Sequence, residues 1–168
     1  MARIGIIGAG SWGIALSVLL HNNGHEVTVW SVIEDEIRML QTEREHKDKL
    51  PGVKLPDDMI FTSNLAEAVK GRDILVLAVP SVYTRSTAKL LKEVVEDKQI
   101  IVNVAKGIEE STLMTLSEIV EEEVPQATVA VLSGPSHAEE VGRGIPTTIV
   151  VGAKEQKIAE YIQNVFMS

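Results

Sequence analysis

The segment GAGSWG at residues 8–13 constrains the fold of this chain more than any other feature of its sequence. It follows the apolar run RIGII and precedes a helix-like stretch in which Ala15, Leu16 and Leu19 share one side. Glycines in the order G-x-G-x-x-G between a strand and a helix are typical of a turn that holds the pyrophosphate of a dinucleotide. The context therefore indicates an α/β fold whose first strand lies near the N-terminus.

The three glycines have separate expected roles in such a turn. Gly8 permits the sharp turn off the strand, Gly10 lets the backbone approach a pyrophosphate, and Gly13 lets the helix pack closely on the strand. The N–H groups of the first helical turn then face the anion. A P-loop would carry lysine and a hydroxyl residue next, where this chain has Ile14 and Ala15, so a Walker site is excluded. The remaining alternative is a packing turn without a ligand.

Strand-like and helix-like segments alternate along the whole chain, as in a parallel sheet covered by helices. The predicted strands are 3–8, 26–30, 59–62, 73–79, 99–104, 128–132 and 147–151, and the predicted helices are 11–23, 64–71, 81–97, 111–123 and 154–166. Asn64 and Glu67 have the spacing of a capping box. The sequence predicts a Rossmann-type, doubly wound, mainly parallel sheet with helices on both faces, as one domain over residues 1–168. The irregular stretch 46–58 is interpreted as a connecting loop, with a position over a ligand crevice as one option.

The composition excludes several classes of function. The chain has no cysteine, which rules out disulfides, thiolate zinc sites and cysteine nucleophiles. Its formal net charge of -8 argues against a nucleic-acid partner, although backbone N–H groups and a placed lysine can still hold a phosphorylated ligand. The longest apolar runs, such as ILVLAV at 74–79, are too short to span a bilayer, and no secretory signal precedes the first strand. A cytoplasmic location is expected.

In open α/β sheets, ligands bind beyond the carboxyl ends of the strands, so the residues that follow each strand are considered together. Besides the glycine turn they are Trp30-Ser31, Pro80-Ser81, Ala105-Lys106-Gly107 and Ser133-Gly134-Pro135-Ser136. Lys106 is the one basic side chain in this set. A lysine is most often a solvated surface charge, and that alternative stays open, but a place between an apolar strand and Gly107 favours a position facing the crevice. Ser136 has two open interpretations, because its hydroxyl suits both a helix cap and a contact with a cofactor or substrate.

Other polar groupings do not indicate a site. His21 and His25 are four residues apart, but Gly24 ends their helix before both can share a face, so no metal site is expected. The acidic runs at 34–36 and 121–123 are interpreted as solvated helix faces.

The sequence does not choose between NAD and NADP. A carboxylate that binds the adenosine ribose usually lies about 20 residues beyond the glycines, at the end of the second strand. That position is Trp30-Ser31-Val32 here, and the first acid after it is Glu34. An arginine that would favour NADP does not occur at this position either.

With these residues in view, the chain resembles the N-terminal domain of bacterial NAD(P)-dependent sn-glycerol-3-phosphate dehydrogenases over essentially its whole length. The matching segments are IGIIGAGSWGIAL, GHEVTVW, LPGVKLP, DILVLAVPS, VAKGIE and VLSGPSHAEEVGRGIPT. Many Rossmann enzymes share the first, whereas AKGIE followed by SGPSHAEEV is close to diagnostic. The resemblance implies reduction of dihydroxyacetone phosphate to sn-glycerol 3-phosphate for phospholipid synthesis, by reversible hydride transfer from NADH or NADPH.

The resemblance also implies roles for individual residues, a small phosphorylated substrate and a homodimeric full-length enzyme. Cofactor contacts are implied for Gly8, Gly10, Ser11, Trp12, Gly13, Pro80, Lys106 and Ala138. Substrate contacts are implied for Lys106, Gly134 and Ser136, with Lys106 between the nicotinamide and the substrate.

Two departures from the family pattern bear on these expectations. The family often carries histidine or arginine just after the second strand, where this chain has Val32 and Ile33, which puts a preference for NADP in question. The helical C-terminal domain that supplies the catalytic lysine and most phosphate contacts is absent from the sequence, which stops at NVFMS. A truncated form is expected, which binds NAD(H) or NADP(H) weakly and turns over negligibly. Another dehydrogenase of the same superfamily and a non-catalytic NAD-sensing module are the alternatives.

Overall fold

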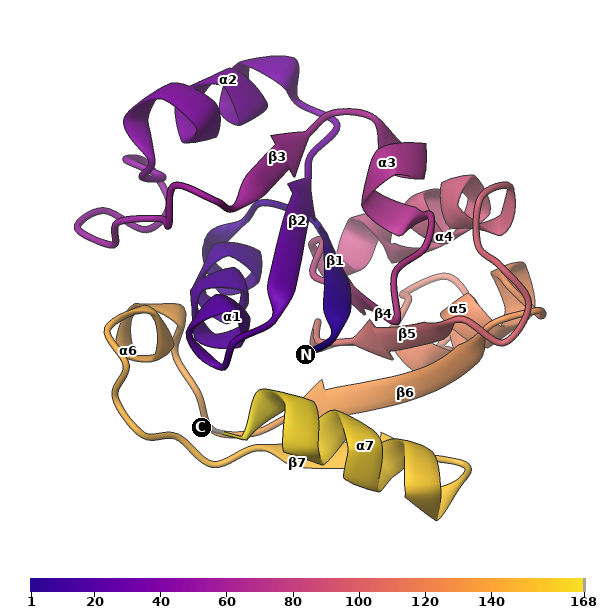
Figure 1. Cartoon of the computed structure of the whole chain (residues 1–168). Coiled ribbons are helices and arrows are strands. Elements are labelled where there is room, and N and C mark those ends of the chain that lie inside the picture. Colours follow the sequence, from indigo (N-terminus) through magenta and orange to yellow (C-terminus); the bar gives the residue numbers. More distant parts are fainter. Residues whose placement is uncertain (168) are drawn as a thin grey trace.

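The computed structural model describes residues 1–167, which build a seven-stranded sheet in the order β3-β2-β1-β4-β5-β6-β7 (Figure 1). The strands are β1 (Arg3–Ile7), β2 (Glu26–Trp30), β3 (Ile60–Thr62), β4 (Ile74–Leu77), β5 (Ile100–Asn103), β6 (Thr128–Ser133) and β7 (Val150–Ala153). Neighbouring strands are parallel except for β6 and β7. The strand order reverses between β1 and β4, so β2 and β3 lie on one side of β1 and the later strands on the other.

Helices cover both faces of this sheet, which confirms the doubly wound, Rossmann-type fold (Figure 1). They are α1 (Ser11–Asn22), α2 (Glu34–Glu43), α3 (Leu65–Val69), α4 (Thr84–Lys92), α5 (Leu116–Glu123), α6 (Ala138–Gly142) and α7 (Gln156–Phe166), with a 3-10 turn at Ser81–Tyr83. Side chains of α1 and α7 pack on one face, together with Ile4 and Ile6 of β1. Side chains of α3, α4 and α5 pack on the other face, against Ile7.

The central strands are apolar almost throughout because both of their faces are buried. Along β4, Ile74 and Val76 belong to one core cluster, whereas Leu75 and Leu77 belong to the other. All four side chains are fully shielded from solvent. The prediction of a buried parallel strand from the run DILVLAV is confirmed.

The last strand and one helix differ from the prediction. The sequence predicts a strand at 147–151, but β7 begins at Val150 and runs antiparallel to β6. It predicts one helix at 81–97, but the structure has a 3-10 turn and then α4, which ends at Lys92. The chain leaves the helix there and buries Val95 in the core. These two boundaries depend on tertiary packing that the local pattern does not specify.

Side-chain caps fix the starts of two helices. Asn64 caps α3 by accepting hydrogen bonds from two backbone N–H groups of its first turn. The reciprocal half of the predicted box is wrong, since the Glu67 carboxylate accepts from Thr62 Oγ1 at 2.7 Å instead. A complete capping box of Thr115 and Glu118 starts α5 later than the predicted residue 111. The other predicted elements agree with the structure to within two residues at each end, and no range was predicted for α2 or α6.

Candidate functional site

The turn between β1 and α1 carries the three glycines of the fingerprint, and the protein itself requires two of them. Gly8 has a φ of +119°, an angle that residues with a side chain rarely adopt. A Cβ atom there would lie 2.7 Å from the Ala78 carbonyl oxygen. A Cβ atom on Gly13 would lie 2.2 Å from the carbonyl oxygen of Gly8. The turn packs too closely against α1 and the end of β4 to leave room for a side chain at either position.

Gly10 differs, because no protein atom lies within 4 Å of the position that its Cβ atom would take. It is the N-cap of α1, has extended backbone angles and supplies no side-chain cap. The first turn of α1 also contains no acidic residue. The N–H groups of this turn have no partner within the helix, and together with the positive end of the helix dipole they form a geometry that binds anions.

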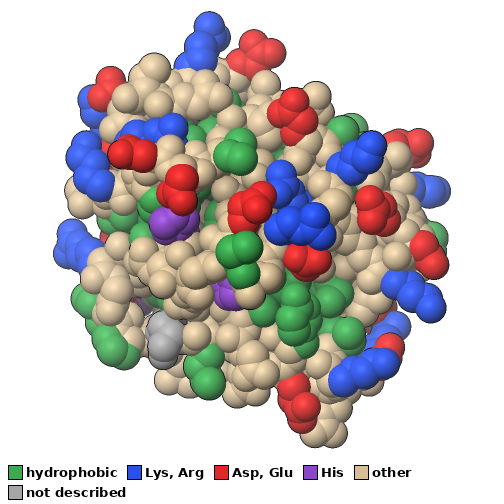
Figure 2. All heavy atoms as spheres, viewed as in Figure 1, with side chains coloured by type: hydrophobic (Ala, Val, Ile, Leu, Met, Phe, Trp, Pro, Cys, Tyr) green, Lys and Arg blue, Asp and Glu red, His purple; other side chains and the backbone are tan. Residues whose placement is uncertain are grey.

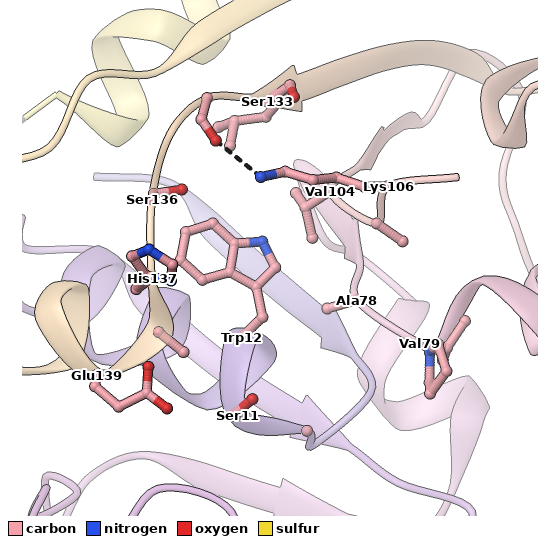
Figure 3. A pocket seen from close by; sticks show the side chains of 16 residues that line it. Ser11, Trp12, Ala78, Val79, Val104, Lys106, Ser133, Ser136, His137 and Glu139 are labelled. Carbon is pink, nitrogen blue, oxygen red and sulfur yellow. Dashed lines mark hydrogen bonds between the residues drawn. The ribbon is translucent and has the colours of Figure 1, made fainter. Parts of the chain in front are cut away.

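A cavity of about 420 Å³ opens next to this turn, at the carboxyl ends of β1, β4, β5 and β6 (Figure 3). It is lined by Gly10, Ser11, Trp12, Ala78, Val79, Pro80, Val104, Ala105, Lys106, Leu132, Ser133, Gly134, Ser136, His137, Ala138 and Glu139. The lining includes every residue for which the resemblance implies a cofactor or substrate contact, except Gly8 and Gly13, which lie in the turn itself. Five of the residues that follow the strands are not part of it, namely Trp30, Ser31, Ser81, Gly107 and Pro135. The cavity occupies the place where open α/β sheets bind ligands, at the reversal of the strand order.

Lys106 and the loop after β6 meet across this cavity. The Nζ atom of Lys106 donates a 2.9 Å hydrogen bond to the carbonyl oxygen of Gly134, shown by the dashed line in Figure 3. The indole of Trp12 projects into the same space from the start of α1 (Figure 3). A cation, a polar loop and an aromatic ring thus border one cavity, although they come from segments far apart in the sequence.

Ser136 does not cap the helix that follows it. That helix, α6, begins at Ala138 with His137 as its N-cap, and no side chain caps it. The side chain of Ser136 lines the cavity instead (Figure 3). His137 and Glu139 line it as well, although the sequence did not predict either as a site residue. The available signal was their position directly after the SGPS segment.

An ion-pair cluster anchors the loop that carries Lys106. Arg85 on α4 donates to both carboxylate oxygens of Glu109, at 2.7 and 2.8 Å, and also pairs with two glutamates of α5. The Arg85 guanidinium and the Thr112 hydroxyl lower the pKa of Glu109 to about 2. Glu109 is therefore ionised at neutral pH and ties the loop after β5 to two helices.

A second polar cluster lies at the end of β2, where this fold places the adenosine ribose of a dinucleotide. Glu36 on α2 is 8% exposed. Its carboxylate accepts hydrogen bonds from Ser31 Oγ, from His46 Nε2 at 2.8 Å and from Lys49 Nζ at 2.5 Å. Burial raises the pKa of Glu36, but these hydrogen bonds and the Lys49 charge outweigh it, so the pKa lies below its ordinary value. The interpretation of 34–36 as a solvated face is wrong for Glu36.

Several features singled out in the sequence lie elsewhere. His21 Nε2 contacts Asp58 Oδ1 at 2.8 Å, and His25 hydrogen-bonds to backbone groups. Within residues 1–167, no three His, Asp or Glu side chains gather where they could hold a metal ion. The loop at 46–58 is absent from the lining of this cavity and buries side chains such as Leu50 in the core.

The charges on one face and the lengths of the helices bear on what a nucleic acid or a membrane would require. Acidic and basic side chains are interspersed on the face that Figure 2 shows. Among the described residues, no helix combines the length and apolarity that crossing a membrane requires.

Comparisons with known proteins agree with this geometry. The family model described as NAD-dependent glycerol-3-phosphate dehydrogenase N-terminus matches residues 3–159. The chain is 63% identical over 168 residues to glycerol-3-phosphate dehydrogenase (NAD(P)+) of Agathobacter rectalis, and 56% identical over 170 residues to that of Fusobacterium nucleatum. Both alignments cover 100% of this chain but 50% and 51% of the relatives. The chain therefore spans about half the length of the curated relatives it matches.

Solved structures give the same assignment. The crystal structure of glycerol-3-phosphate dehydrogenase from Coxiella burnetii matches with a TM-score of 0.93 and 28% identity, over 99% of this chain and 51% of that one. A UDP-D-ManNAc dehydrogenase from Pyrococcus horikoshii, with a TM-score of 0.79 and 14% identity over 98% of this chain and 44% of its own, shares the fold alone. The resemblance found in the sequence is confirmed, and the chain belongs to the family of NAD-dependent glycerol-3-phosphate dehydrogenases, as their N-terminal part.

Proposed function

We propose that this chain is the dinucleotide-binding domain of an enzyme that reduces dihydroxyacetone phosphate to sn-glycerol 3-phosphate with NADH or NADPH. The observation that carries the proposal is the open space at Gly10, beside the uncapped start of α1 and the cavity that contains Lys106. Protein packing explains Gly8 and Gly13 but gives no reason for a glycine at position 10. Close approach of a pyrophosphate does give one.

The glycine turn and the cavity would bind different parts of the dinucleotide. The first N–H groups of α1, at Ser11 and Trp12, would receive the pyrophosphate. The nicotinamide would lie in the cavity, bordered by Pro80 and Ala138. The bound nicotinamide supplies the hydride, and the apolar cavity walls limit the access of water to it.

Lys106 would bind and polarise the substrate. Its ammonium group has three N–H donors, of which one holds the Gly134 carbonyl oxygen in the structure. The others can be donated to a substrate oxygen, whose negative charge increases when a hydride reaches the carbonyl carbon. Gly134 and Ser136 would border the substrate on the opposite side of the cavity.

The remaining half of the relatives' length would complete the site. We infer that a helical substrate domain in the full-length protein supplies the lysine that acts as general acid and base, and that this full-length protein is a homodimer. The 168-residue chain alone would then bind the cofactor but position the substrate poorly, and misplacement by about 1 Å can lower a rate by about a hundredfold. Its turnover is expected to be negligible.

An exchange of halves tests the proposed reaction. The chain replaces the N-terminal half of the Agathobacter rectalis dehydrogenase, with which it is 63% identical over its whole length. We expect the chimera to oxidise NADH or NADPH when dihydroxyacetone phosphate is added, and not when ketoacids are added. Lys106→Met should lower kcat/KM by about 100-fold or more, because the developing oxyanion loses a charged donor.

The matched control is Lys157→Met on α7, because that side chain is 78% exposed and removes the same charge. We expect this variant to retain the activity of the chimera. A folded chimera that binds NADH but leaves dihydroxyacetone phosphate unreduced, or that prefers a ketoacid, would contradict the proposed function.

A further inference from the structure

The end of β2 adjoins the glycine turn directly. The N–H group of Gly8 donates a 2.9 Å hydrogen bond to the carbonyl oxygen of Trp30, the last residue of β2. Ser31 therefore begins the segment beside the pyrophosphate-binding turn, where this fold places the adenosine ribose. Val32 follows with an exposed fraction of 71%. A group on the 2′ position of that ribose would meet this segment.

The polar groups of this segment are arranged to accept hydrogen bonds. The Ser31 hydroxyl donates its proton to Glu36 Oε2, and its oxygen accepts a 3.1 Å bond from the Ile33 N–H group. Because the Ser31 hydroxyl donates its proton to Glu36, it can only accept a further hydrogen bond, through its remaining lone pair. A lone pair suits the 2′-hydroxyl of NAD, which can donate, and it opposes the 2′-phosphate of NADP, whose oxygens only accept.

The charges of the segment act in the same direction. Residues 31–35 read SVIED and contain no cation. Lys49, which comes from the following loop, is paired with Glu36 at 2.5 Å, and Arg38 is paired with Asp35. His46 does not supply a cation instead, because its Nδ1 atom accepts a hydrogen bond from the backbone N–H group of Lys49 while its Nε2 atom donates to Glu36. Because Glu36 is buried, its charge is poorly screened by salt.

We propose that the end of β2 selects NAD(H) over NADP(H), and that Glu36 is the positioning residue that sets this preference, through the Ser31 hydroxyl and the Lys49 charge. The inference rests on the proposed function and adds the choice of cofactor, which the relatives' name NAD(P)+ leaves open. Glu36 takes the role of the acid that the sequence lacks at the β2 end, although it comes from α2 and acts through a neighbour.

Parallel titrations of the 168-residue chain with NADH and NADPH test the preference, with the fluorescence of Trp12 and Trp30 as the readout. NADH should bind at least about tenfold more tightly than NADPH, because the extra phosphate brings close to two negative charges to a site whose nearest cation, Lys49, is already paired with Glu36. Glu36→Gln keeps the size of the side chain and releases the Lys49 charge. We expect it to tighten NADPH binding by about tenfold and to change NADH binding little.

A second variant keeps the test valid if Glu36→Gln folds poorly. Val32→Arg adds a guanidinium at an exposed position and should also tighten NADPH binding by about tenfold or more. Glu43→Gln is the matched control, because it removes the same charge at the far end of α2, where Glu43 pairs with Lys47. The ratio of the two dissociation constants should not change in this control.

The outcomes separate this inference from the proposed function. Equal or tighter binding of NADPH by the unchanged chain would overturn the inference and leave the proposed function intact. So would an unchanged ratio in both folded variants, or an equal shift in Glu43→Gln. Failure of the unchanged chain to bind either dinucleotide would overturn both.

Discussion

At the scale of single residues, the glycine fingerprint separates into positions that the fold requires and one that it does not. Gly8 and Gly13 lie against backbone carbonyl oxygens, where any side chain would collide. Gly10 faces open space and has ordinary extended backbone angles. In the motif GAGSWG, Gly8 and Gly13 are therefore required for packing, whereas Gly10 is open to a ligand. Substitutions can distinguish the two roles.

The packing role predicts a loss of stability. Gly13→Ala places a methyl group 2.2 Å from the Gly8 carbonyl oxygen, so the turn must move away from α1. We expect the free energy of unfolding to fall by about 1–3 kcal/mol, the usual cost of overpacking. Urea denaturation followed by circular dichroism measures it. Stability equal to that of the unchanged chain would show that the turn relaxes freely and that packing does not require this glycine.

Residue-level prediction from the sequence succeeded where the signal was local. Lys106 follows an apolar strand and precedes a glycine, and this pattern alone placed it at the crevice, where the structure has it. Glu36 was misread because its partners His46 and Lys49 lie 10 and 13 residues further along the chain. No local pattern indicates that a charged residue in an acidic run is buried by a later loop.

At the scale of elements, the loop after β5 owes its position to α4 and α5. Arg85 reaches Glu109 from α4 and the α5 glutamates at the same time. The Lys106 side chain starts from this loop, three residues before Glu109. The ion pairs therefore help to hold the ammonium group in the cavity.

The Arg85 cluster predicts a pH dependence of stability. The pKa of Glu109 falls from 4.5 to about 2 on folding, so the carboxylate stabilises the fold fully above about pH 4.5. This contribution is lost as the pH falls from about 4.5 towards 2, because the carboxylate then takes up a proton in the unfolded chain while it stays ionised in the folded one, which favours unfolding. At pH 7 the unchanged chain should unfold at a higher temperature than Glu109→Gln, and this difference should disappear near pH 2.

Glu110→Gln is the control for this experiment, because Glu110 is an exposed neighbour that carries the same charge. It should show a smaller difference from the unchanged chain over the same pH range. A difference between Glu109→Gln and the unchanged chain that stays constant from pH 7 to pH 2 would contradict the assigned ion pair.

Element types were predictable from the sequence, but several boundaries were not. Buried parallel strands such as β4 are uninterrupted apolar runs, and the glycine turn gives the start of α1. The antiparallel direction of β7 depends on how the chain returns after α6, which is a tertiary property. The late start of α5 follows from the capping box of Thr115 and Glu118, whereas the predicted helix began at residue 111.

At the scale of the whole molecule, the proposed cofactor spans the reversal of strand order in the sheet. Its adenosine end would lie over β2 and its nicotinamide end over β5 and β6. One ligand would therefore contact strands on both sides of β1. A ligand that binds the folded state alone stabilises it by about 2.7 kcal/mol at 100 times its dissociation constant. For a chain of this length, that corresponds to a rise of about 5–10 °C in the unfolding temperature.

The central claim is that GAGSWG holds a dinucleotide, and the most direct test is thermal unfolding of the chain and of Gly10→Val, each with and without excess NADH. The account predicts that both proteins fold and that their unfolding temperatures without ligand are close, because a Cβ atom at position 10 meets no protein atom and the weaker N-cap costs only about 1 kcal/mol. NADH should raise the unfolding temperature of the unchanged chain and leave that of Gly10→Val where it was. An equal rise in both proteins, or no rise in either, would contradict the account.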